Sequence, residues 1–234
     1  MLPKLTQPIY TLTIPSTGKT VRFRPFTVKE EKLLLMVKEG PDANSIAEVY
    51  KQLVNNCVLD SINVDNMAAI DIEYVFLQLR SKSVSNVTQI KIKDPDDGQF
   101  YEVEVDLEQI EIANLDKPKK FQLTDQIGVV LRWPTFKSLL AIGKTAATEA
   151  GRGQAGAALI KMCLDTVWDG DNVYTVAEFS NAEVEEFIDS LGVKDLATIS
   201  EFFNNLPYLH TTVTYVKADK TVVKREVRGL QSFF

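Results

Sequence analysis

Hydrophobic and polar positions near the start of the chain predict a β-hairpin followed by a helix. Residues Tyr10–Ile14 and Val21–Phe23 are rich in β-branched and aromatic side chains, which favour strands. Between them lies the turn sequence Pro15–Gly18, in which proline fixes φ and glycine tolerates a positive φ. Thr27 and Glu30 then have the spacing of a capping box, which predicts that a helix begins there.

Two further helices are predicted by apolar residues that recur every three or four positions. Residues 46–58 carry the strongest amphipathic pattern in the chain, with Leu53 and Cys57 on its apolar side. The next helix is predicted to begin near Asp71, because the helix dipole favours a carboxylate at that end. Its predicted buried stripe consists of Ile72, Val75, Phe76 and Leu79.

From Val87 onward the period of the pattern changes to two, which predicts a second hairpin. Apolar residues alternate with lysines in the first strand and with carboxylates in the second, on either side of the turn Asp94–Gly98. An antiparallel pairing brings these opposite charges close together on the outer face. Residues 109–112 are expected to extend the second strand or to form a strand of their own.

The second half of the chain is predicted to contain a strand, four helices and a final hairpin. The strand covers residues 127–133, and the helices follow Pro134, cover 159–167, follow Ser180 and cover 196–203. The final hairpin joins residues 209–217 to 221–228. The glycine-containing residues 151–156 are expected to connect the first two of these helices.

The arrangement of these elements predicts the fold class and the domains. Hairpins and helices are segregated rather than alternating as βαβ units, which is typical of an α+β fold. The polar, proline-containing run from Ala113 to Lys120 is the predicted linker. It separates an N-terminal domain of hairpin, three helices and central hairpin, residues 1–112, from a C-terminal domain that ends in a hairpin, residues 121–234.

The overall composition excludes few functions, but the net charge bears on the class of partner and the cysteine count bears on disulfide formation. Of the 234 residues, 45% are hydrophobic and 25% are charged, as in an ordinary globular protein. The net charge of −6 argues against nucleic acid as the main partner, because binding phosphates needs a basic surface. No apolar run approaches the roughly 20 residues that a membrane-spanning helix needs. Cys57 and Cys163 are the only cysteines, and two buried thiols are favoured over a disulfide.

Motifs for nucleotide or metal chemistry are incomplete. The string Gly151–Gly156 matches the dinucleotide pattern G-x-G-x-x-G, but a helix is predicted before it where that fold needs a strand. The turn Asp94–Gly98 has its glycine one place too early for a calcium loop, and Val105 stands where the bidentate glutamate belongs. His210 is the only histidine, with no cysteine or serine elbow near it in sequence. We therefore expect no cofactor, no metal site and no catalytic residue.

Two features near the C-terminus are candidates for contacts with other proteins. The final hairpin gathers five basic residues in an acidic chain, and the chain ends on two phenylalanines. The candidate partner-binding residues are Lys217, Lys220, Lys224, Arg225, Arg228, Phe233 and Phe234. Alternatively, the basic residues are solvated charges that protect a strand edge from aggregation. The alternative for the phenylalanines is that the terminus docks on the protein's own core.

Three separated runs of the sequence resemble a known family. They are Phe23–Leu35 (FRPFTVKEEKLLL), Asp71–Val84 (DIEYVFLQLRSKSV) and Leu123–Phe136 (LTDQIGVVLRWPTF). These runs are similar to the baseplate hub assembly proteins of T-even-type contractile-tailed bacteriophages. The resemblance implies a protein without enzymatic activity that binds other baseplate hub or tail proteins during assembly in the host cytoplasm.

The predicted function is therefore that of an assembly factor or chaperone of the baseplate hub. A permanent structural subunit, located in the tail baseplate of the virion, is the alternative that the same sequence would serve. A nucleotide-binding enzyme built on residues 151–156 is an alternative of a different class. We expect no nucleic acid, membrane or small-molecule substrate as a partner, and homo-oligomerisation stays open.

Overall fold

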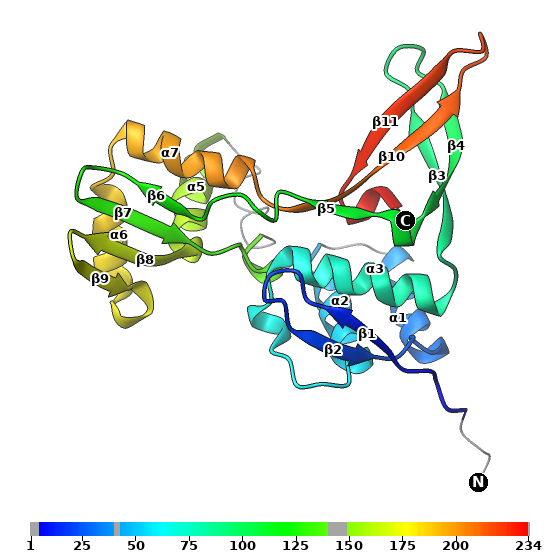
Figure 1. Ribbon diagram of the computed structural model, residues 1–234, viewed down its shortest axis with the longest axis horizontal. Coiled ribbons are helices and arrows are strands. Elements are labelled where there is room, and N and C mark those ends of the chain that lie inside the picture. The colour runs from blue at the N-terminus through cyan, green and yellow to red at the C-terminus, as the bar shows by residue number, and fades with distance from the viewer. Residues whose placement is uncertain (1–4, 40–42, 140–148, 234) are drawn as a thin grey trace. The chain divides into compact units, whose positions relative to one another are not determined.

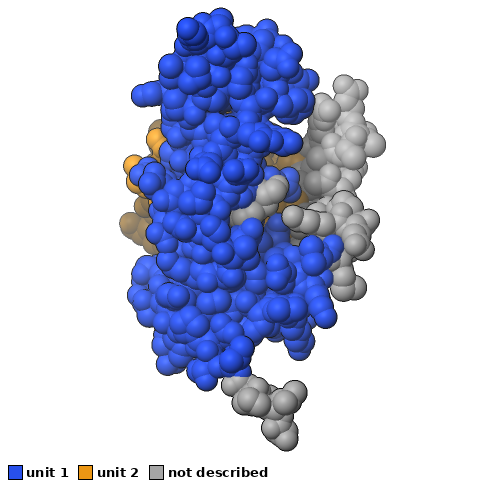
Figure 2. All heavy atoms as spheres, turned by 90° about the vertical axis from the view of Figure 1, so that its right-hand side faces the viewer, with its two compact units in different colours: residues 1–64, 70–113, 207–234 blue, residues 65–69, 114–206 orange. Residues whose placement is uncertain are grey.

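The protein consists of helices and small antiparallel sheets (Figure 1). The computed structural model describes residues 5–39, 43–139 and 149–233. Contacts between residues divide the chain into two compact units, which Figure 2 colours separately. Unit 1 consists of residues 1–64, 70–113 and 207–234, and unit 2 consists of residues 65–69 and 114–206. The expected α+β fold is confirmed, because all pairings between the described strands are antiparallel.

The two units divide the chain differently from the predicted domains at the C-terminus. The predicted C-terminal domain extends to residue 234, whereas residues 207–234 belong to unit 1. The physical reason is that β10 (Tyr208–Val216) pairs with β5 (Glu111–Ala113) on one edge and with β11 (Val222–Arg228) on the other. Most of unit 2 is therefore an insertion between β5 and β10, and the predicted linker begins where the chain leaves unit 1.

The N-terminal hairpin and the helices that follow it belong to unit 1. β1 (Tyr10–Thr13) pairs with β2 (Thr20–Phe23) across the predicted turn, where Gly18 has a φ of 67°. The helices are α1 (Val28–Glu39), α2 (Ala43–Cys57) and α3 (Ala69–Ser83). The predicted buried stripe of α3 is confirmed, because none of its residues is more than 3% exposed: Ile72, Val75, Phe76 and Leu79.

Two buried carboxylates tie these elements together. Asp71 is 1% exposed and accepts hydrogen bonds from the backbone N–H of Ser16, at 2.8 Å, and from the Ser16 hydroxyl. It therefore holds the turn of the first hairpin against the first turn of α3. Glu30 accepts hydrogen bonds from the N–H and the hydroxyl of Thr27, at 2.8 and 2.5 Å. This contact is the Glu30 half of the predicted capping box, and it pairs a donor that the helix itself leaves without a partner.

Two longer hairpins complete unit 1. β3 (Val87–Lys93) pairs with β4 (Phe100–Asp106) as the alternation predicted, and Nζ of Lys91 lies 3.1 Å from Oε1 of Glu102 across the pair. The hairpin of β10 and β11 lies against it through contacts between β10 and β4 (Figure 1). Both hairpins bury the apolar side chains of one face: Ile90, Ile92, Val103, Val105, Val213, Tyr215 and Val227.

Unit 2 is built on a four-stranded antiparallel sheet. In spatial order the strands are β6 (Lys120–Gln122), β7 (Ile127–Leu131), β8 (Leu164–Asp169) and β9 (Asn172–Thr175). α5 (Glu149–Cys163) leads directly into β8, and α6 (Asn181–Asp189) and α7 (Val193–Asn204) follow β9. Ser180 and Glu183 form a complete capping box at the start of α6. The core side chains of these last two helices are Val184, Ile188, Ile199 and Phe202.

Two predictions for residues 151–169 are wrong. The expected connection, residues 151–156, is helical and lies within α5, and the helix expected over 159–167 ends at Cys163. β8 begins at the next residue, Leu164. Leu164 and Val167 continue the apolar spacing of α5 in the sequence, so the pattern alone favours a longer helix. Pairing with both β7 and β9 makes this segment a strand instead. β9 was not predicted, because all of its residues are exposed.

Gly128 provides a test of the packing in unit 2. It lies opposite Trp168 in the pairing of β7 with β8, and a Cβ atom at position 128 would lie 1.9 Å from Cζ2 of the indole. Replacing Gly128 by alanine would force the indole out of its place. We expect this variant to lose roughly 1–3 kcal/mol in the free energy of unfolding, measured by urea denaturation.

The matched control is Gly156→Ala, because Gly156 lies in α5 and a Cβ there would meet nothing within 4 Å. We expect this control to gain up to about 1 kcal/mol, since alanine is the better helix former. Equal stability of the two variants would contradict the packing of Trp168 over Gly128.

Candidate protein-binding surface

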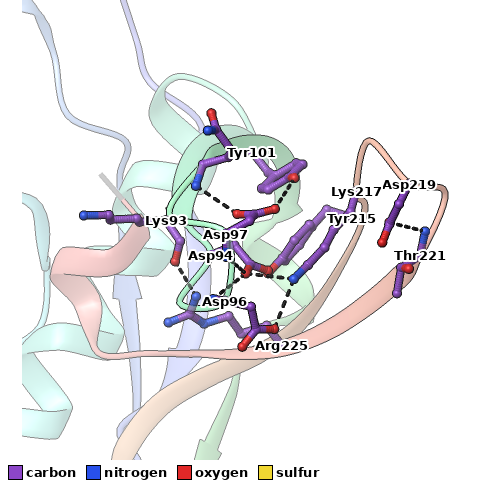
Figure 3. Close-up of polar contacts among 11 residues, drawn as sticks. Lys93, Asp94, Asp96, Asp97, Tyr101, Tyr215, Lys217, Asp219, Thr221 and Arg225 are labelled. Carbon is purple, nitrogen blue, oxygen red and sulfur yellow. Dashed lines mark hydrogen bonds and ion pairs between the residues drawn. The ribbon is translucent and has the colours of Figure 1, made fainter.

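The tips of the two long hairpins are joined by a buried carboxylate (Figure 3). Asp94 follows β3 and is 1% exposed. Its carboxylate accepts hydrogen bonds from the hydroxyl of Tyr215, at 2.5 Å, and from the ammonium of Lys217, at 2.9 Å. The backbone N–H of Asp96 donates to it as well, at 2.8 Å. We call Asp94, Tyr215 and Lys217 the hairpin clamp, because they connect the end of β3 to the end of β10.

The clamp fixes the charge states of its members. Hydrogen bonds from Lys217 and Tyr215 hold the pKa of the Asp94 carboxyl well below its usual range. The hydrogen bond to Asp94 raises the pKa of Lys217 and that of Tyr215 in turn. A buried carboxylate without donors would be costly, and here the donors come from the other hairpin. The ion pair is therefore an internal connection within unit 1.

Two further contacts support the clamp. The rings of Tyr101 and Tyr215 are stacked, with 4.7 Å between their centroids. Nη1 of Arg225 donates a hydrogen bond to the backbone oxygen of Lys93, at 2.5 Å. Figure 3 shows these side chains converging from both hairpins. The relative position of the two hairpin tips is thus set by aromatic, ionic and backbone contacts together.

Replacing Asp94 by asparagine is expected to loosen the hairpin tips. The amide retains the shape but removes the charge, so the bonds from Tyr215 and Lys217 weaken. We expect hydrogen exchange in the turn, at residues 96–99, to become about tenfold faster at neutral pH. Because the pKa of Asp94 is depressed, its contribution is present at neutral pH and is lost as the pH falls below the usual carboxyl range.

The control for this variant is Asp96→Asn. Asp96 also contacts Lys217, at 3.1 Å, but its side chain is 82% exposed. An exposed ion pair contributes little, so turn exchange should change by less than about twofold. If both variants speed exchange equally, burial of Asp94 is not what holds the tips together.

Two of the five basic residues predicted to contact partners are engaged within the protein. Lys217 is 12% exposed and belongs to the clamp. Arg225 is half-buried and bonds to the backbone of β3. These contacts could not be predicted from the local pattern, because Asp94 and Lys217 are separated by 123 positions.

The other three basic residues are exposed. The guanidinium of Arg228 pairs with Glu226, at 2.6 Å, and lies over the ring of Tyr208. Lys220 lies in the turn between β10 and β11, and Lys224 lies on β11. These positions leave Lys220 and Lys224 accessible to a partner.

The structure places the C-terminal Phe233 inside unit 1. It belongs to the 3₁₀ helix Leu230–Phe233 and is 0% exposed. The backbone N–H of Leu230 donates to the carboxyl of Glu73 on α3, whose pKa is raised to about 7 by burial. Phe234 lies outside the described residues. Burial of Phe233 favours the alternative that the terminus docks on its own core.

A basic groove runs between β3 and β11 in unit 1. It has a volume of about 680 Å³ and is lined by Gln89, Ile90, Lys91, Ile92, Lys93, Arg225, Glu226, Val227, Arg228, Gln231 and Ser232. Four of these residues are cationic and one is anionic, in a chain with a net charge of −6. The sequence indicated the cations of β11, but only the fold shows that two lysines of β3 line the same groove.

Unit 2 has a different kind of surface next to α6. An apolar cavity of about 330 Å³ is lined by Ile127, Leu164, Val167, Asp169, Tyr174, Val176, Phe179, Glu183, Val184 and Phe187. Tyr174 and Phe179 are 41% and 42% exposed, with their ring centroids 6.1 Å apart. This exposed aromatic pair was not predicted, because the strand that carries Tyr174 was not.

Comparison with known protein families identifies the family to which the chain belongs. The family model described as "T4 bacteriophage base plate protein" matches residues 7–234, which include both units. The chain belongs to this base plate protein family. The resemblance carried by the three sequence runs is thereby confirmed at the level of a T4-type phage base plate protein. Searches of curated proteins and of solved structures found no significant match.

The nucleotide and metal motifs of this base plate family member have no matching geometry. Residues 151–156 are helical throughout, whereas a pyrophosphate loop needs a turn between strand and helix. No group of three or more histidine, cysteine, aspartate or glutamate residues that could hold a metal ion occurs in residues 5–39, 43–139 and 149–233. Nδ1 of His210 lies 3.2 Å from Oε1 of Glu226 on the neighbouring strand.

The two thiols are placed for packing rather than for chemistry. Cys57 and Cys163 are free and fully buried. Burial raises the pKa of Cys57 to about 11 and that of Cys163 to about 12. Because the thiolate is the reactive form, both side chains are poor nucleophiles at neutral pH.

No helix in the described part of the chain is long and apolar enough to cross a membrane.

Proposed function

We propose that this base plate family member is an assembly factor for the hub of a phage tail baseplate and acts by binding other proteins. Membership in the base plate family supports a role in building that structure. The observation that carries the proposal is the basic groove of unit 1, because it gathers four cations on the surface of an acidic protein.

The chemistry of the groove supports binding rather than catalysis. Its lysines and arginines are cationic at neutral pH, and its one carboxylate, Glu226, is paired with Arg228. General acid–base catalysis would need one group that is protonated and one that is deprotonated at the working pH, both facing a common substrate. The basic side chains are instead suited to an acidic partner surface, which they would attract and orient.

The proposed partners are other baseplate hub or tail proteins, met in the host cytoplasm while the baseplate assembles. The description of the family favours a second candidate, a permanent structural subunit of the base plate. The two roles differ in one respect that can be measured, which is whether the protein remains in finished particles.

The test uses the tagged full-length chain, co-expressed with the base plate proteins of its phage. We expect at least one of them to be captured. The double variant Lys91→Glu with Lys93→Glu should weaken this capture, because it reverses two exposed charges that line the groove. The control is Lys117→Glu with Lys194→Glu, which makes the same change at two exposed positions of unit 2.

Two results would overturn the proposal. If the chain captures no base plate protein, binding is not its function. If mass spectrometry finds the chain in finished particles at the level of structural subunits, the permanent subunit replaces the assembly factor.

A further inference from the structure

We infer that the basic groove binds an acidic, extended segment of a partner protein, which pairs as an added strand with the free edge of β3. The inference rests on the proposed function, since it specifies how that protein-binding surface recognises its partner. It follows from the backbone of β3, from the charges beside it and from the strand that already pairs with its other edge.

β3 is paired on one edge only among the described strands, because its sheet contains β3 and β4 alone. The N–H of Asp94 bonds to the oxygen of Gln99, which continues the pairing of β3 with β4. Backbone groups of successive residues in a strand point to opposite edges, so Ile92 and Ile90 also face β4. The backbone groups that face away from β4 are those of Val87, Gln89, Lys91 and Lys93.

The bond made by Arg225 shows that this outer edge faces the groove. Its guanidinium comes from the β11 side of the groove and donates to the backbone oxygen of Lys93. The N–H and C=O groups of Gln89 and Lys91 come next along the same edge and have no neighbouring strand among the described residues. Such a row of donors and acceptors is a template for an incoming strand.

The side chains along this edge define the partner's sequence pattern. Lys91 and Lys93 are exposed, and Arg228 lines the opposite wall. On its paired edge, Lys91 already lies opposite Glu102 of β4, where acidic residues alternate with apolar ones. An added strand with the same alternation would place carboxylates beside the lysines. Glu226 is the one acidic residue of the groove, and its charge is offset by Arg228.

A nucleic acid fits this edge less well than a peptide does. Phosphate groups accept hydrogen bonds but do not donate them, so they would leave the outward carbonyls of Gln89 and Lys91 unpaired. A polypeptide strand supplies both donors and acceptors at the spacing of β3. The backbone of the groove therefore favours an extended peptide, and its charge favours an acidic one.

The first test uses a capped synthetic peptide with the sequence of residues 100–106, FYEVEVD, added to the full-length protein. We expect the amides of Gln89 and Lys91 to exchange with solvent about tenfold more slowly when the peptide is bound, since they gain backbone bonds. Added salt should weaken binding, because the lysines are exposed. Failure of the peptide to bind, or binding without protection of these two amides, would overturn the inference.

The second test removes the N–H groups along one edge of the peptide at a time. N-methylation of one alternate set of residues in the peptide should abolish binding, while N-methylation of the other set should not, because only one set faces β3. This comparison leaves the protein unchanged. Equal binding of both methylated peptides would exclude strand addition. Displacement of the peptide by oligothymidylate with higher affinity would identify a phosphate-binding groove instead.

The third test is the variant Lys91→Pro, which removes an outward N–H and leaves the bonds of β3 to β4 in place. We expect it to bind the peptide at least about tenfold less tightly than the wild type. If Lys91→Pro still captures base plate proteins as the wild type does, the inference is wrong and the proposed function stands. If the wild type captures none, the proposed function fails whatever the peptide does.

Discussion

Replacing Phe233 by alanine is expected to lower the free energy of unfolding by about 3–5 kcal/mol. The side chain lies one residue before the end of the chain, yet it is 0% exposed. Gly229 turns the chain into this final segment with a φ of 76°, and its N–H bonds to the oxygen of Leu209 at 2.8 Å. Leu230 is buried beside it, at 3% exposure. The tail is thus packed as part of the core of unit 1, and truncating Phe233 leaves a cavity there.

Urea denaturation monitored by circular dichroism measures this effect. The control is Gln231→Ala, in the same 3₁₀ helix but exposed, which should change stability by less than about 0.5 kcal/mol. If Phe233→Ala has wild-type stability but weakened capture of base plate proteins, the tail is a partner anchor and its burial changes on binding.

The elements predicted most accurately from the sequence are those that depend on residues close together in the chain. The first hairpin depends on a turn of four residues between two short strands, and the residues Pro15–Gly18 indicate that turn. The β3–β4 hairpin likewise depends on alternation over neighbouring residues. The apolar residues of α3 recur every three or four positions, which predicts a helix rather than a strand. In the two hairpins the paired strands are adjacent in the sequence, and in α3 the buried side chains follow from the period of a single helix, so periodicity and turn chemistry contain most of the information.

The parts that were missed depend on partners far apart in the sequence. The pairing of β5 with β10 joins segments on either side of unit 2 and changes the domain division, although neither strand signals it. β8 is a strand because β7 and β9 flank it, while its own apolar residues continue the pattern of α5. Such contacts follow from the fold as a whole, and the local pattern does not encode them.

The same distinction applies to the candidate surface. The sequence shows five basic residues on the last hairpin but does not show which of them are accessible to a partner. The fold separates Lys217, which holds Asp94, from Lys224, which is exposed. It also brings Lys91 and Lys93 of another hairpin into one groove with Arg225 and Arg228. Composition therefore predicted a basic surface, and only tertiary structure shows which charges are accessible and where a free strand edge lies among them.

The second large effect is expected for Glu30→Gln, which should lower the free energy of unfolding by about 2–3 kcal/mol at pH 7. Glu30 is 3% exposed, and its carboxylate lies 3.0 Å from Nη2 of Arg24. Arg24, the residue after β2, also donates to the backbone oxygen of Asn56, so the pair links the end of β2 to α1 and α2. Glutamine keeps the bond to the N–H of Thr27 but cannot supply the negative charge that Arg24 meets.

The pH dependence of this variant identifies the source of the effect. Burial alone would raise the pKa of Glu30, but hydrogen bonds from Arg24 and Thr27 outweigh it and lower the pKa to about 2. Because the folded protein then binds fewer protons than the unfolded chain, the stabilisation is present above about pH 4.5 and is lost as the pH falls toward 2. The difference between wild type and Glu30→Gln should therefore shrink across this range.

Urea denaturation at several pH values between 7 and 2.5 measures the difference, with Glu104→Gln as the control at an exposed position of β4. That control should change stability by less than about 0.5 kcal/mol at every pH. A loss for Glu30→Gln that stays constant from pH 7 to pH 2.5 would mean that shape, rather than the charge shared with Arg24, holds the start of α1 to its neighbours. A loss that shrinks in acid would identify the charge of Glu30, shared with Arg24, as the source of the stabilisation.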